Sequence, residues 1–317
     1  MNKRLLMAVQ YDLPLTETPF LDLAERIGED PRKVIEELRE LKARGVIKRI
    51  GANLNYKAFG RIKKAVLVAF ACENVSEVAK VINESIDPIS LKHNYLRDHP
   101  KYRVWFTFKG RDVEELRRKV KEIAEACGVV DYLFLPSKRV YKMDVKYDLF
   151  RGISWSPKGL EREKVPNVEE MGLNPKMLFE LERNLGIEER PFKRIAERYG
   201  YGEAELVDLL KELIDKGVVR DFSGVLRERT IGFVENGMNL VGSVDNVKEM
   251  AKRLVKEFPE ITHLVERETS ENWPYPLYFV VHADSREKIE NVRRRVEERF
   301  GVPVMTLYSV KNLNPKL

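Results

Sequence analysis

The second half of this chain repeats the first half. Pro19-Phe20 returns as Pro191-Phe192, and the segments that follow stay in register, so that Gly45 is matched by Gly217. Each copy is long enough to enclose a core of its own in a chain of 317 residues. A repeat of this length predicts a duplicated two-domain unit, with small insertions confined to loops. The fold must therefore be assembled from two related halves.

Each half begins with the pattern of a winged helix-turn-helix. Residues 2–10 have apolar side chains at helical spacing, and Pro19 is placed to open a second helix that Gly28 would end. Asp30 is a suitable cap for a third helix, which Gly45 would follow. Strands at 46–50 and 54–56 would then form the wing.

The second part of each half alternates strands and helices in the order βαββαβ. We expect strands at 65–70, 91–96, 103–108 and 132–135 with helices at 75–85 and 113–126, and the matching pieces at 237–244, 247–257, 262–267, 277–283, 286–300 and 304–308. This order predicts an α+β, ferredoxin-like sandwich with its helices on one face of the sheet. The predicted domains are winged helices at 1–60 and 173–232, ferredoxin-like domains at 61–150 and 233–317, and a linker at 151–172.

The composition favours a globular protein with an anionic partner. It is 43% hydrophobic and 34% charged, and no apolar run approaches the roughly 18 residues that a membrane span needs. The start of the chain does not resemble an export signal, so we expect a cytoplasmic protein. The net charge of +6 is compatible with nucleic acid or with a polycarboxylate. The two cysteines lack the spacing of a metal site.

One stretch, from Ile89 to Phe108, recurs with its most reactive side chains in place. His93 stands four residues before Arg97, and His263 stands four residues before Arg267. Residues two and four apart on a strand share one face, so each pair would lie on one side of a sheet. Histidine is the natural proton donor near neutral pH, and arginine pairs with carboxylates.

Some residues around these pairs are further candidates for the site, and others are expected to lie outside it. Tyr95 would share the face of the first pair, and aromatic runs containing Tyr102, Trp105 and Tyr275 follow the two pairs. The other two of the four histidines, His99 and His282, are expected to face solvent.

A winged helix followed by a βαββαβ domain resembles the leucine-responsive regulator family, which would imply DNA binding. A recognition helix should present basic or amide side chains to the groove. The stretch of the third predicted helix instead mixes acidic with basic residues, namely Glu29, Asp30, Glu36, Glu37 and Glu40 with Arg32, Lys33, Arg39 and Lys42. The second copy is more acidic, with five Asp and Glu residues between Glu203 and Asp215 against Lys211 and Lys216. Because phosphate neutralisation supplies most non-specific affinity, no nucleic acid partner is expected.

The motifs resemble those of the siroheme decarboxylases more closely, over nearly the whole chain. The shared features are Thr18-Pro19-Phe20 with Arg190-Pro191-Phe192, Lys48-Arg49-Ile50-Gly51-Ala52, the strands containing His93 and Trp105, and the late run from Leu135 to Lys142. That family has paired homologous subunits, and this chain is similar to the two fused end to end. The resemblance implies a carboxy-lyase that converts siroheme to 12,18-didecarboxysiroheme in the alternative haem biosynthesis route.

The resemblance also implies roles for particular residues. Catalytic roles fall to His93, Tyr95, Arg97 and His263, and substrate-binding roles to Lys48, Arg49, Tyr102, Trp105, Arg139, Lys142, Arg267 and Tyr275. No added cofactor and no metal held by the protein alone are expected, since siroheme brings its own iron, to which His93 or His263 could be an axial ligand. The fused halves would form an internal pseudo-dimer, with further homodimerisation plausible.

The halves are not equivalent at these positions. Tyr95 is replaced by Val265, and Lys48-Arg49 by Arg220-Asp221. We therefore expect the first half to supply most catalytic groups. Two alternatives stay open, namely a leucine-responsive-type DNA-binding regulator that senses haem or an amino acid, and a tetrapyrrole-binding protein without turnover.

Overall fold

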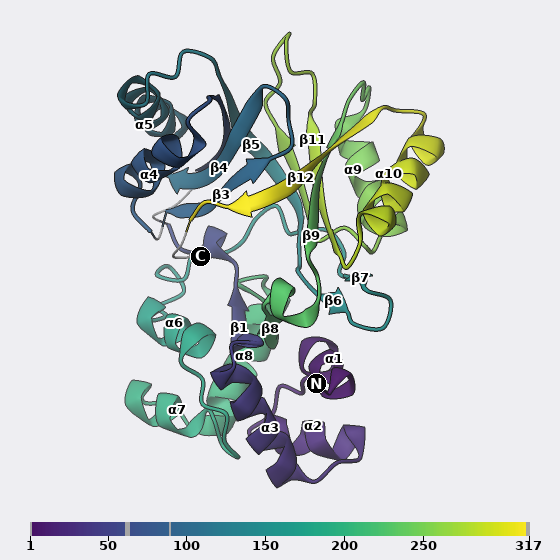
Figure 1. The fold of residues 1–317 in the computed structure, drawn as a ribbon. Coiled ribbons are helices and arrows are strands. Elements are labelled where there is room, and N and C mark those ends of the chain that lie inside the picture. The colour runs from purple at the N-terminus through teal and green to yellow at the C-terminus, as the bar shows by residue number, and fades with distance from the viewer. Residues whose placement is uncertain (1, 61–63, 89, 315–317) are drawn as a thin grey trace. The chain divides into compact units, whose positions relative to one another are not determined.

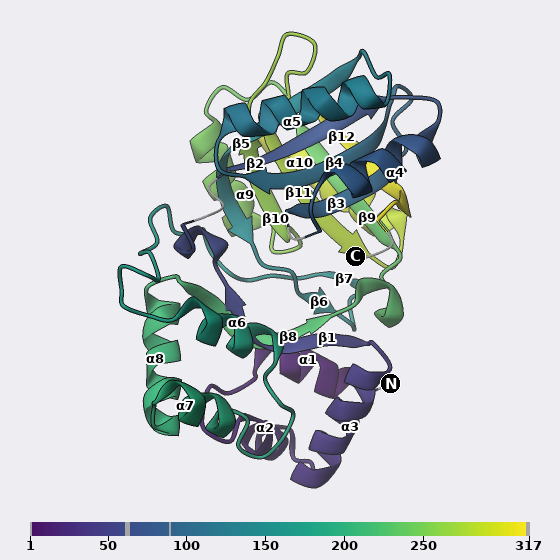
Figure 2. The ribbon, with the colours of Figure 1, turned by 90° about the vertical axis from the view of Figure 1, so that its left-hand side faces the viewer.

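The computed structural model describes residues 2–60, 64–88 and 90–314, and these form two compact units (Figures 1 and 2). The first unit collects residues 1–60, 145–152 and 162–233, and the second collects 61–144, 153–161 and 234–317. Like segments of the two halves thus fold together, winged-helix segments in one unit and βαββαβ segments in the other. Ile89, at the start of the repeated stretch, lies outside the described residues.

The helices of the first unit begin and end where the sequence signals them. Helix α2 (Pro19–Ile27) has a proline in its first turn and ends at Gly28, whose φ of 70° is left-handed. Asp30 caps α3 (Pro31–Ala43) by accepting the backbone N–H groups of Arg32 and Lys33. The remaining elements are α1 (Lys3–Tyr11), η1 (Tyr56–Ala58), β6 (Tyr147–Asp148), α6 (Pro175–Arg183), α7 (Lys193–Tyr199), α8 (Glu203–Asp215) and η2 (Glu228–Ile231).

The predicted wing hairpin is wrong. Residues 47–54 form one continuous strand, β1 (Ile47–Leu54), and its antiparallel partner is β8 (Val219–Leu226) from the second half. The reason is visible at Gly51, where α6 crosses β1 so closely that a Cβ would lie 2.2 Å from the Leu181 carbonyl oxygen. Helix α1 packs against β8 in the corresponding way. Each half therefore completes the other, which local sequence signals cannot show.

The second unit contains two βαββαβ segments in the predicted order. The first consists of β2 (Lys64–Ala71), α4 (Val75–Ser85), β3 (Leu91–Arg97), β4 (Tyr102–Gly110), α5 (Val113–Ala126) and β5 (Tyr132–Met143). The second consists of β9 (Glu235–Val241), α9 (Val247–Glu257), β10 (His263–Arg267), β11 (Leu277–Ala283), α10 (Arg286–Phe300) and β12 (Val304–Asn312). Strands β2 and β4 consist largely of buried apolar residues, and the helices are amphipathic, with one apolar face each. These two patterns account for the arrangement.

The strands of the second unit close into a ring. Their hydrogen-bonded order runs β10-β5-β2-β4-β3-β12-β9-β11, and β11 pairs with β10 again. The two halves meet at two equivalent seams, β3 with β12 and β10 with β5. Three apolar cores result, one under each pair of helices and a third inside the ring, where Trp105 packs with Leu240 and Tyr278. Because the ring is closed, each strand at the two seams is paired along both of its edges.

The predicted linker is partly built into the second unit. Strand β7 (Ile153–Ser154) pairs with β11, the Ser154 hydroxyl donates to the Glu260 carbonyl oxygen at 2.6 Å, and the Ser156 N–H donates to the Pro259 carbonyl oxygen at 2.6 Å. From residue 162 onward the segment belongs to the first unit. Within the described residues, no helix is long and apolar enough to cross a membrane.

Candidate active site

Strand β3 holds the first predicted His–Arg pair on one face. Asn94 points to the opposite face, where its side-chain amide donates to Asn83 on α4. His93 and Tyr95 therefore project away from the helices, and their rings stack with centroids 5.8 Å apart. The Arg97 guanidinium lies 5.6 Å from the centre of the Tyr95 ring. The structure thus brings the three predicted residues of this strand into one row.

Strand β10 holds the second pair in the same way. His263 and Val265 stand opposite Val280 and Tyr278 of β11, on the side that contributes to the core inside the ring. The His263 Nδ1 atom lies 2.9 Å from the Thr262 hydroxyl. Arg267 follows on the same face, with its guanidinium 5.5 Å from the centre of the Tyr278 ring.

The two arginines make equivalent hydrogen bonds across the two seams. Arg97 donates through Nη1 to the Leu307 carbonyl oxygen at 2.8 Å, and Arg267 donates through Nη1 to the Leu135 carbonyl oxygen at 3.1 Å. Each bond joins a strand of one half to the last strand of the other half. Both side chains consequently help to hold the halves together, a role that the repeat in the sequence did not reveal.

Among the described residues, Arg267 carries a buried charge with no ion-pair partner. The residue is 8% exposed, and within the part of the chain that the structure describes it forms no ion pair and its Nε has no hydrogen-bond partner. Burial lowers its pKa from the ordinary value of 12.5 to about 10, and the nearby Tyr278 only partly offsets this. The guanidinium remains protonated at neutral pH. A buried cation in this state favours the approach of a carboxylate.

An aromatic cluster lies next to the two strands. Trp273, in the connection between β10 and β11, contacts Tyr102, Trp105 and Tyr275 at ring-centroid distances of 5.6, 5.8 and 5.2 Å. Its indole N–H donates to the Tyr278 hydroxyl at 2.8 Å. The predicted aromatic residues are thus gathered in one place, and Trp105, at 1% exposed, belongs to the core inside the ring.

One aromatic residue of this cluster, Trp273, was missed as a site candidate. Tyr278 belongs to the aromatic run after the second pair and was not selected as a site residue. The available signal was length: the connection after Arg267 is longer than the one after Arg97, and it contains a tryptophan. Burial raises the pKa of Tyr278, so its hydroxyl stays protonated beside Arg267.

The two predicted basic residues of β5, Arg139 and Lys142, have different surroundings. The Arg139 guanidinium lies 4.5 Å from the centre of the Tyr141 ring. Lys142 is 0% exposed, and its ammonium donates to the Ser156 carbonyl oxygen at 2.6 Å. Burial lowers the Lys142 pKa to about 8, although Asp144 and Glu260 counteract the effect. Lys142 therefore points into the fold, where it holds the segment that follows β7.

The remaining two histidines differ in their exposure. His282 is buried at 6% exposed, and its backbone N–H donates to the Ser154 hydroxyl at 3.0 Å. His99 is half-buried, and its Nδ1 accepts the backbone N–H groups of Lys101 and Tyr102. The expectation that His282 faces solvent was wrong, because this buried residue pairs through its backbone with Ser154. His99 is partly exposed, and its ring completes a turn.

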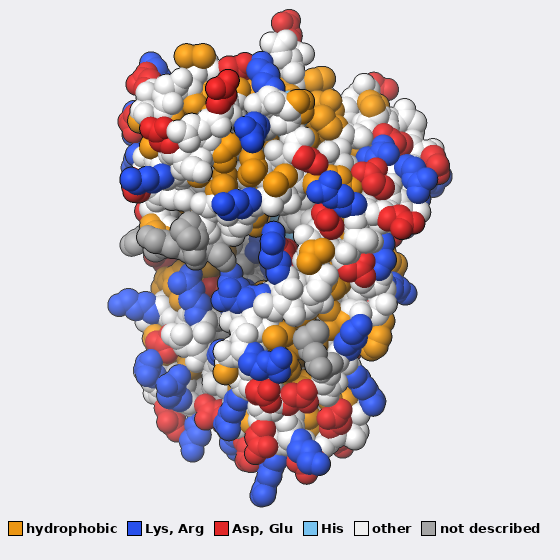
Figure 3. Space-filling model, viewed as in Figure 1, with side chains coloured by type: hydrophobic (Ala, Val, Ile, Leu, Met, Phe, Trp, Pro, Cys, Tyr) orange, Lys and Arg blue, Asp and Glu red, His pale blue; other side chains and the backbone are white. Residues whose placement is uncertain are grey.

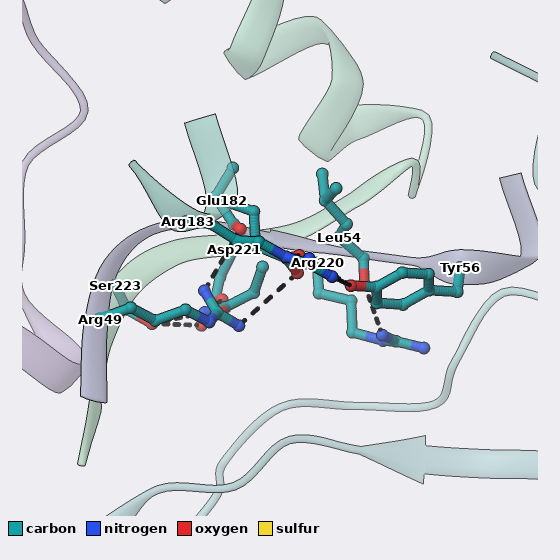
Figure 4. A network of polar contacts seen from close by, with 10 residues as sticks. Arg49, Leu54, Tyr56, Glu182, Arg183, Arg220, Asp221 and Ser223 are labelled. Carbon is teal, nitrogen blue, oxygen red and sulfur yellow. Dashed lines mark hydrogen bonds and ion pairs between the residues drawn. The ribbon is translucent and has the colours of Figure 1, made fainter. Parts of the chain in front are cut away.

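The predicted basic residues of β1 belong to the first unit. Figure 3 shows Lys and Arg side chains gathered over β1 and α6, and Figure 4 shows the polar network there. The Arg49 guanidinium lies 3.7 Å from the Glu182 carboxylate, which also accepts the Tyr56 hydroxyl at 2.7 Å. Burial lowers the pKa of Lys48, with Arg227 and Arg49 adding to the effect. Arg220, which replaces Lys48 in the second half, donates to the Leu54 carbonyl oxygen at 2.8 Å.

The described residues contain no group of three or more His, Cys, Asp or Glu side chains that could hold a metal ion. The candidate chemistry therefore consists of two imidazoles, two seam arginines and a set of aromatic rings. This combination can transfer protons and bind carboxylates.

Comparison with known proteins assigns the family. The AsnC-like ligand binding domain matches residues 60–142 and 230–314, and the siroheme decarboxylase NirDL-like HTH domain matches residues 2–48 and 175–220. A siroheme decarboxylase beta subunit from Methanosarcina barkeri is 35% identical over 133 residues, covering 42% of this chain and 88% of that subunit. This chain belongs to the siroheme decarboxylase family.

Other siroheme decarboxylases match the chain at nearly full length. The enzyme of Hydrogenobacter thermophilus is 29% identical over 291 residues, covering 90% of this chain and 84% of that protein. The crystal structure of the siroheme decarboxylase NirDL matches with a TM-score of 0.66 and 25% identity, covering 99% of this chain and 92% of that chain. A crystal structure of the siroheme decarboxylase NirDL in complex with an iron-uroporphyrin III analogue matches with a TM-score of 0.65 and 25% identity. The expected family and duplicated fold are confirmed.

Proposed function

We propose that this chain is a siroheme decarboxylase, a carboxy-lyase that removes two acetate carboxyl groups from siroheme and yields 12,18-didecarboxysiroheme. The observation that carries the proposal is the uncompensated guanidinium of Arg267 on the same strand face as His263. A polycarboxylate substrate supplies the missing anion. Family membership and the named activity of the full-length relatives support the same reading.

The spacing of the two side chains suits a large flat substrate. Residues four apart on a strand are separated by roughly 13 Å, at about 3.3 Å per residue. A tetrapyrrole with acidic groups at its rim has comparable dimensions, so one carboxylate can reach Arg267 while another part of the ring lies near His263. Arginine suits this task because its planar guanidinium binds a carboxylate through two hydrogen bonds.

The reaction is a protonation followed by loss of carbon dioxide. A proton added to the ring carbon next to the one that carries the acetate creates an electron sink conjugated with the acetate CH₂. The carbon–carbon bond to the carboxylate then breaks, carbon dioxide leaves, and the electron pair forms an exocyclic double bond that neutralises the sink. A second proton adds to the exocyclic carbon to give a methyl group, and the ring carbon releases the first proton. Each carboxyl group removed consumes one proton overall, which a histidine can deliver and recover from water.

The proposal includes no added cofactor. Loss of carbon dioxide from an acetate leaves the oxidation state of the iron unchanged, and that iron enters as part of the substrate. His93 or His263 would act either as the proton donor or as an axial ligand to the iron. Further association of the internally paired chain into a homodimer also remains part of the proposal.

The regulator alternative has weaker support. The winged-helix segments match the siroheme decarboxylase NirDL-like HTH domain, and α3 mixes Glu36, Glu37 and Glu40 with its basic side chains. The equivalent helix of the second half, α8, carries five acidic side chains and one lysine, so duplex DNA would meet like charge there.

Anaerobic incubation with siroheme followed by mass spectrometry tests the activity. The expected product is lighter than siroheme by two carbon dioxide units. Tight binding of siroheme with no change in its mass would identify a tetrapyrrole-binding protein without turnover. Salt-dependent binding to duplex DNA without siroheme binding would instead support the regulator.

A further inference from the structure

Thr262 is held rigidly beside His263. Its side chain is 0% exposed, its backbone N–H donates to the Val280 carbonyl oxygen at 3.0 Å, and its own carbonyl oxygen accepts the Asp144 N–H at 2.9 Å. The Thr262 hydroxyl oxygen lies 3.1 Å from the Val280 carbonyl oxygen and 2.9 Å from His263 Nδ1. The hydroxyl therefore has two polar neighbours in fixed positions.

Both contacts can be hydrogen bonds at the same time in only one arrangement. A hydroxyl has one proton to donate, and a carbonyl oxygen can only accept. In that arrangement the Thr262 proton is given to the Val280 carbonyl oxygen, which leaves a lone pair of the hydroxyl oxygen facing His263. That lone pair is satisfied when Nδ1 carries a hydrogen. Neutral His263 then has its hydrogen on Nδ1 and its basic lone pair on Nε2.

We infer that Thr262 is a positioning residue that sets the tautomer of His263, so that proton transfer or iron ligation by this histidine occurs at Nε2. The first half has no equivalent threonine, because Lys92 occupies the matching position before His93. His93 is instead exposed and stacked on Tyr95. His263 thus has a defined basic nitrogen, which gives the second half an active part in the reaction. The catalytic significance of this inference rests on the proposed function, but the tautomer itself does not.

The direct test is nuclear magnetic resonance of the full-length chain with ¹⁵N-labelled histidine, recorded without substrate above the pKa of the rings. His263→Gln assigns the His263 signals. The wild type should show hydrogen on Nδ1, Thr262→Ser should keep it there, and Thr262→Val should shift the population towards hydrogen on Nε2. Hydrogen on Nε2 in the wild type, or an unchanged spectrum in Thr262→Val, would overturn the inference.

Turnover of siroheme gives the functional readout. Thr262→Val should lower kcat about tenfold or more with little change in KM, in the range that loss of an orienting hydrogen bond produces, and Thr262→Ser should restore most of the rate. Thr306→Val is the matched control, because its hydroxyl donates to Asn239 at 2.6 Å and not to a histidine. Unchanged kcat in Thr262→Val would refute the positioning role. Absence of turnover in the wild type would defeat the proposed function and leave the spectroscopic result standing.

Discussion

At the scale of single residues, the two histidines have different surroundings although they occupy repeated positions. His93 is exposed and stacks on Tyr95, whereas His263 is half-buried and bonded to Thr262. The repeat predicted their shared strand face, and the structure adds the contacts that distinguish them. Their contributions to the reaction should therefore be separable by substitution.

The first prediction concerns these histidines. His93→Ala and His263→Ala should each reduce kcat by about a hundredfold or more and change siroheme affinity much less, because general acid–base catalysis typically contributes factors of this size. Single-turnover kinetics and equilibrium titration with siroheme measure the two effects. A variant that loses binding but retains its rate would show that its histidine holds the substrate and does not transfer a proton.

The second prediction concerns the charge of Arg267. Arg267→Met should weaken tetrapyrrole binding by at least tenfold, since a hydrogen bond to a charged group contributes about 1.5–3 kcal/mol. The ligand-free chain should lose little stability, because the variant also removes an uncompensated buried cation. Calorimetry with a tetrapyrrole carboxylate and thermal unfolding check both parts.

The control for that prediction is Arg286→Met, because Arg286 is exposed and forms an ion pair with Glu235 at 3.2 Å. It should leave tetrapyrrole binding unchanged. A large loss of stability in Arg267→Met with unchanged affinity would show that Arg267 serves only as a tie across the seam.

The third prediction concerns Lys142 and pH. Its pKa is about 8 in the folded chain and 10.5 ordinarily, so between these values the unfolded chain binds more protons and stability rises with pH. Relative to Lys142→Met, the wild type should therefore gain up to about 3 kcal/mol in its free energy of unfolding as pH rises through this window. Urea denaturation at pH 7.5 and 10.5 measures the change. Parallel pH dependence of the two proteins would contradict it.

At the scale of elements, the crossing of α6 over β1 depends on a glycine. The fourth prediction is that Gly51→Ala destabilises the chain by about 3 kcal/mol, because the added Cβ would lie 2.2 Å from the Leu181 backbone oxygen and one element would have to move. Gly159→Ala is the matched control, since nothing lies within 4 Å of its Cβ position. Denaturation midpoints compare them, and equal midpoints would show that α6 shifts at no cost.

At the scale of the whole molecule, the duplication makes each half dependent on the other. Strands β3 and β5 of the first half find their outer partners in β12 and β10 of the second half. A half expressed alone would leave both of these strand edges unpaired, which favours aggregation. Two of the related siroheme decarboxylase subunits match 42% and 46% of this chain, which is about the length of one half.

The fifth prediction follows from these seams. If the chain is cut within the segment between residues 156 and 172, the two pieces should be insoluble when made separately and should form a stable pair when made together. Co-purification through a tag on one piece, followed by light scattering, measures this. Two pieces that are each soluble and monomeric would show that the seams contribute little to folding.

The sequence by itself determined the helix boundaries, the βαββαβ order and the shared face of each His–Arg pair, because caps, apolar periodicity and strand alternation act over a few residues. Only the tertiary structure showed which strands pair with each other. The expected wing hairpin gave way to pairing of β1 with β8, since hydrogen bonding between distant strands is not encoded in local pattern.

The same distinction holds in the site. Adjacent residues on a strand normally point to opposite faces, so the contact of Thr262 with His263 could not be read from their order. The charge of Arg267 was evident from the sequence, and only the closed ring of strands showed it to be buried without an anion. The chemical groups of the site can be read from the sequence, whereas their burial and their contacts are set only when the two halves of the chain fold together.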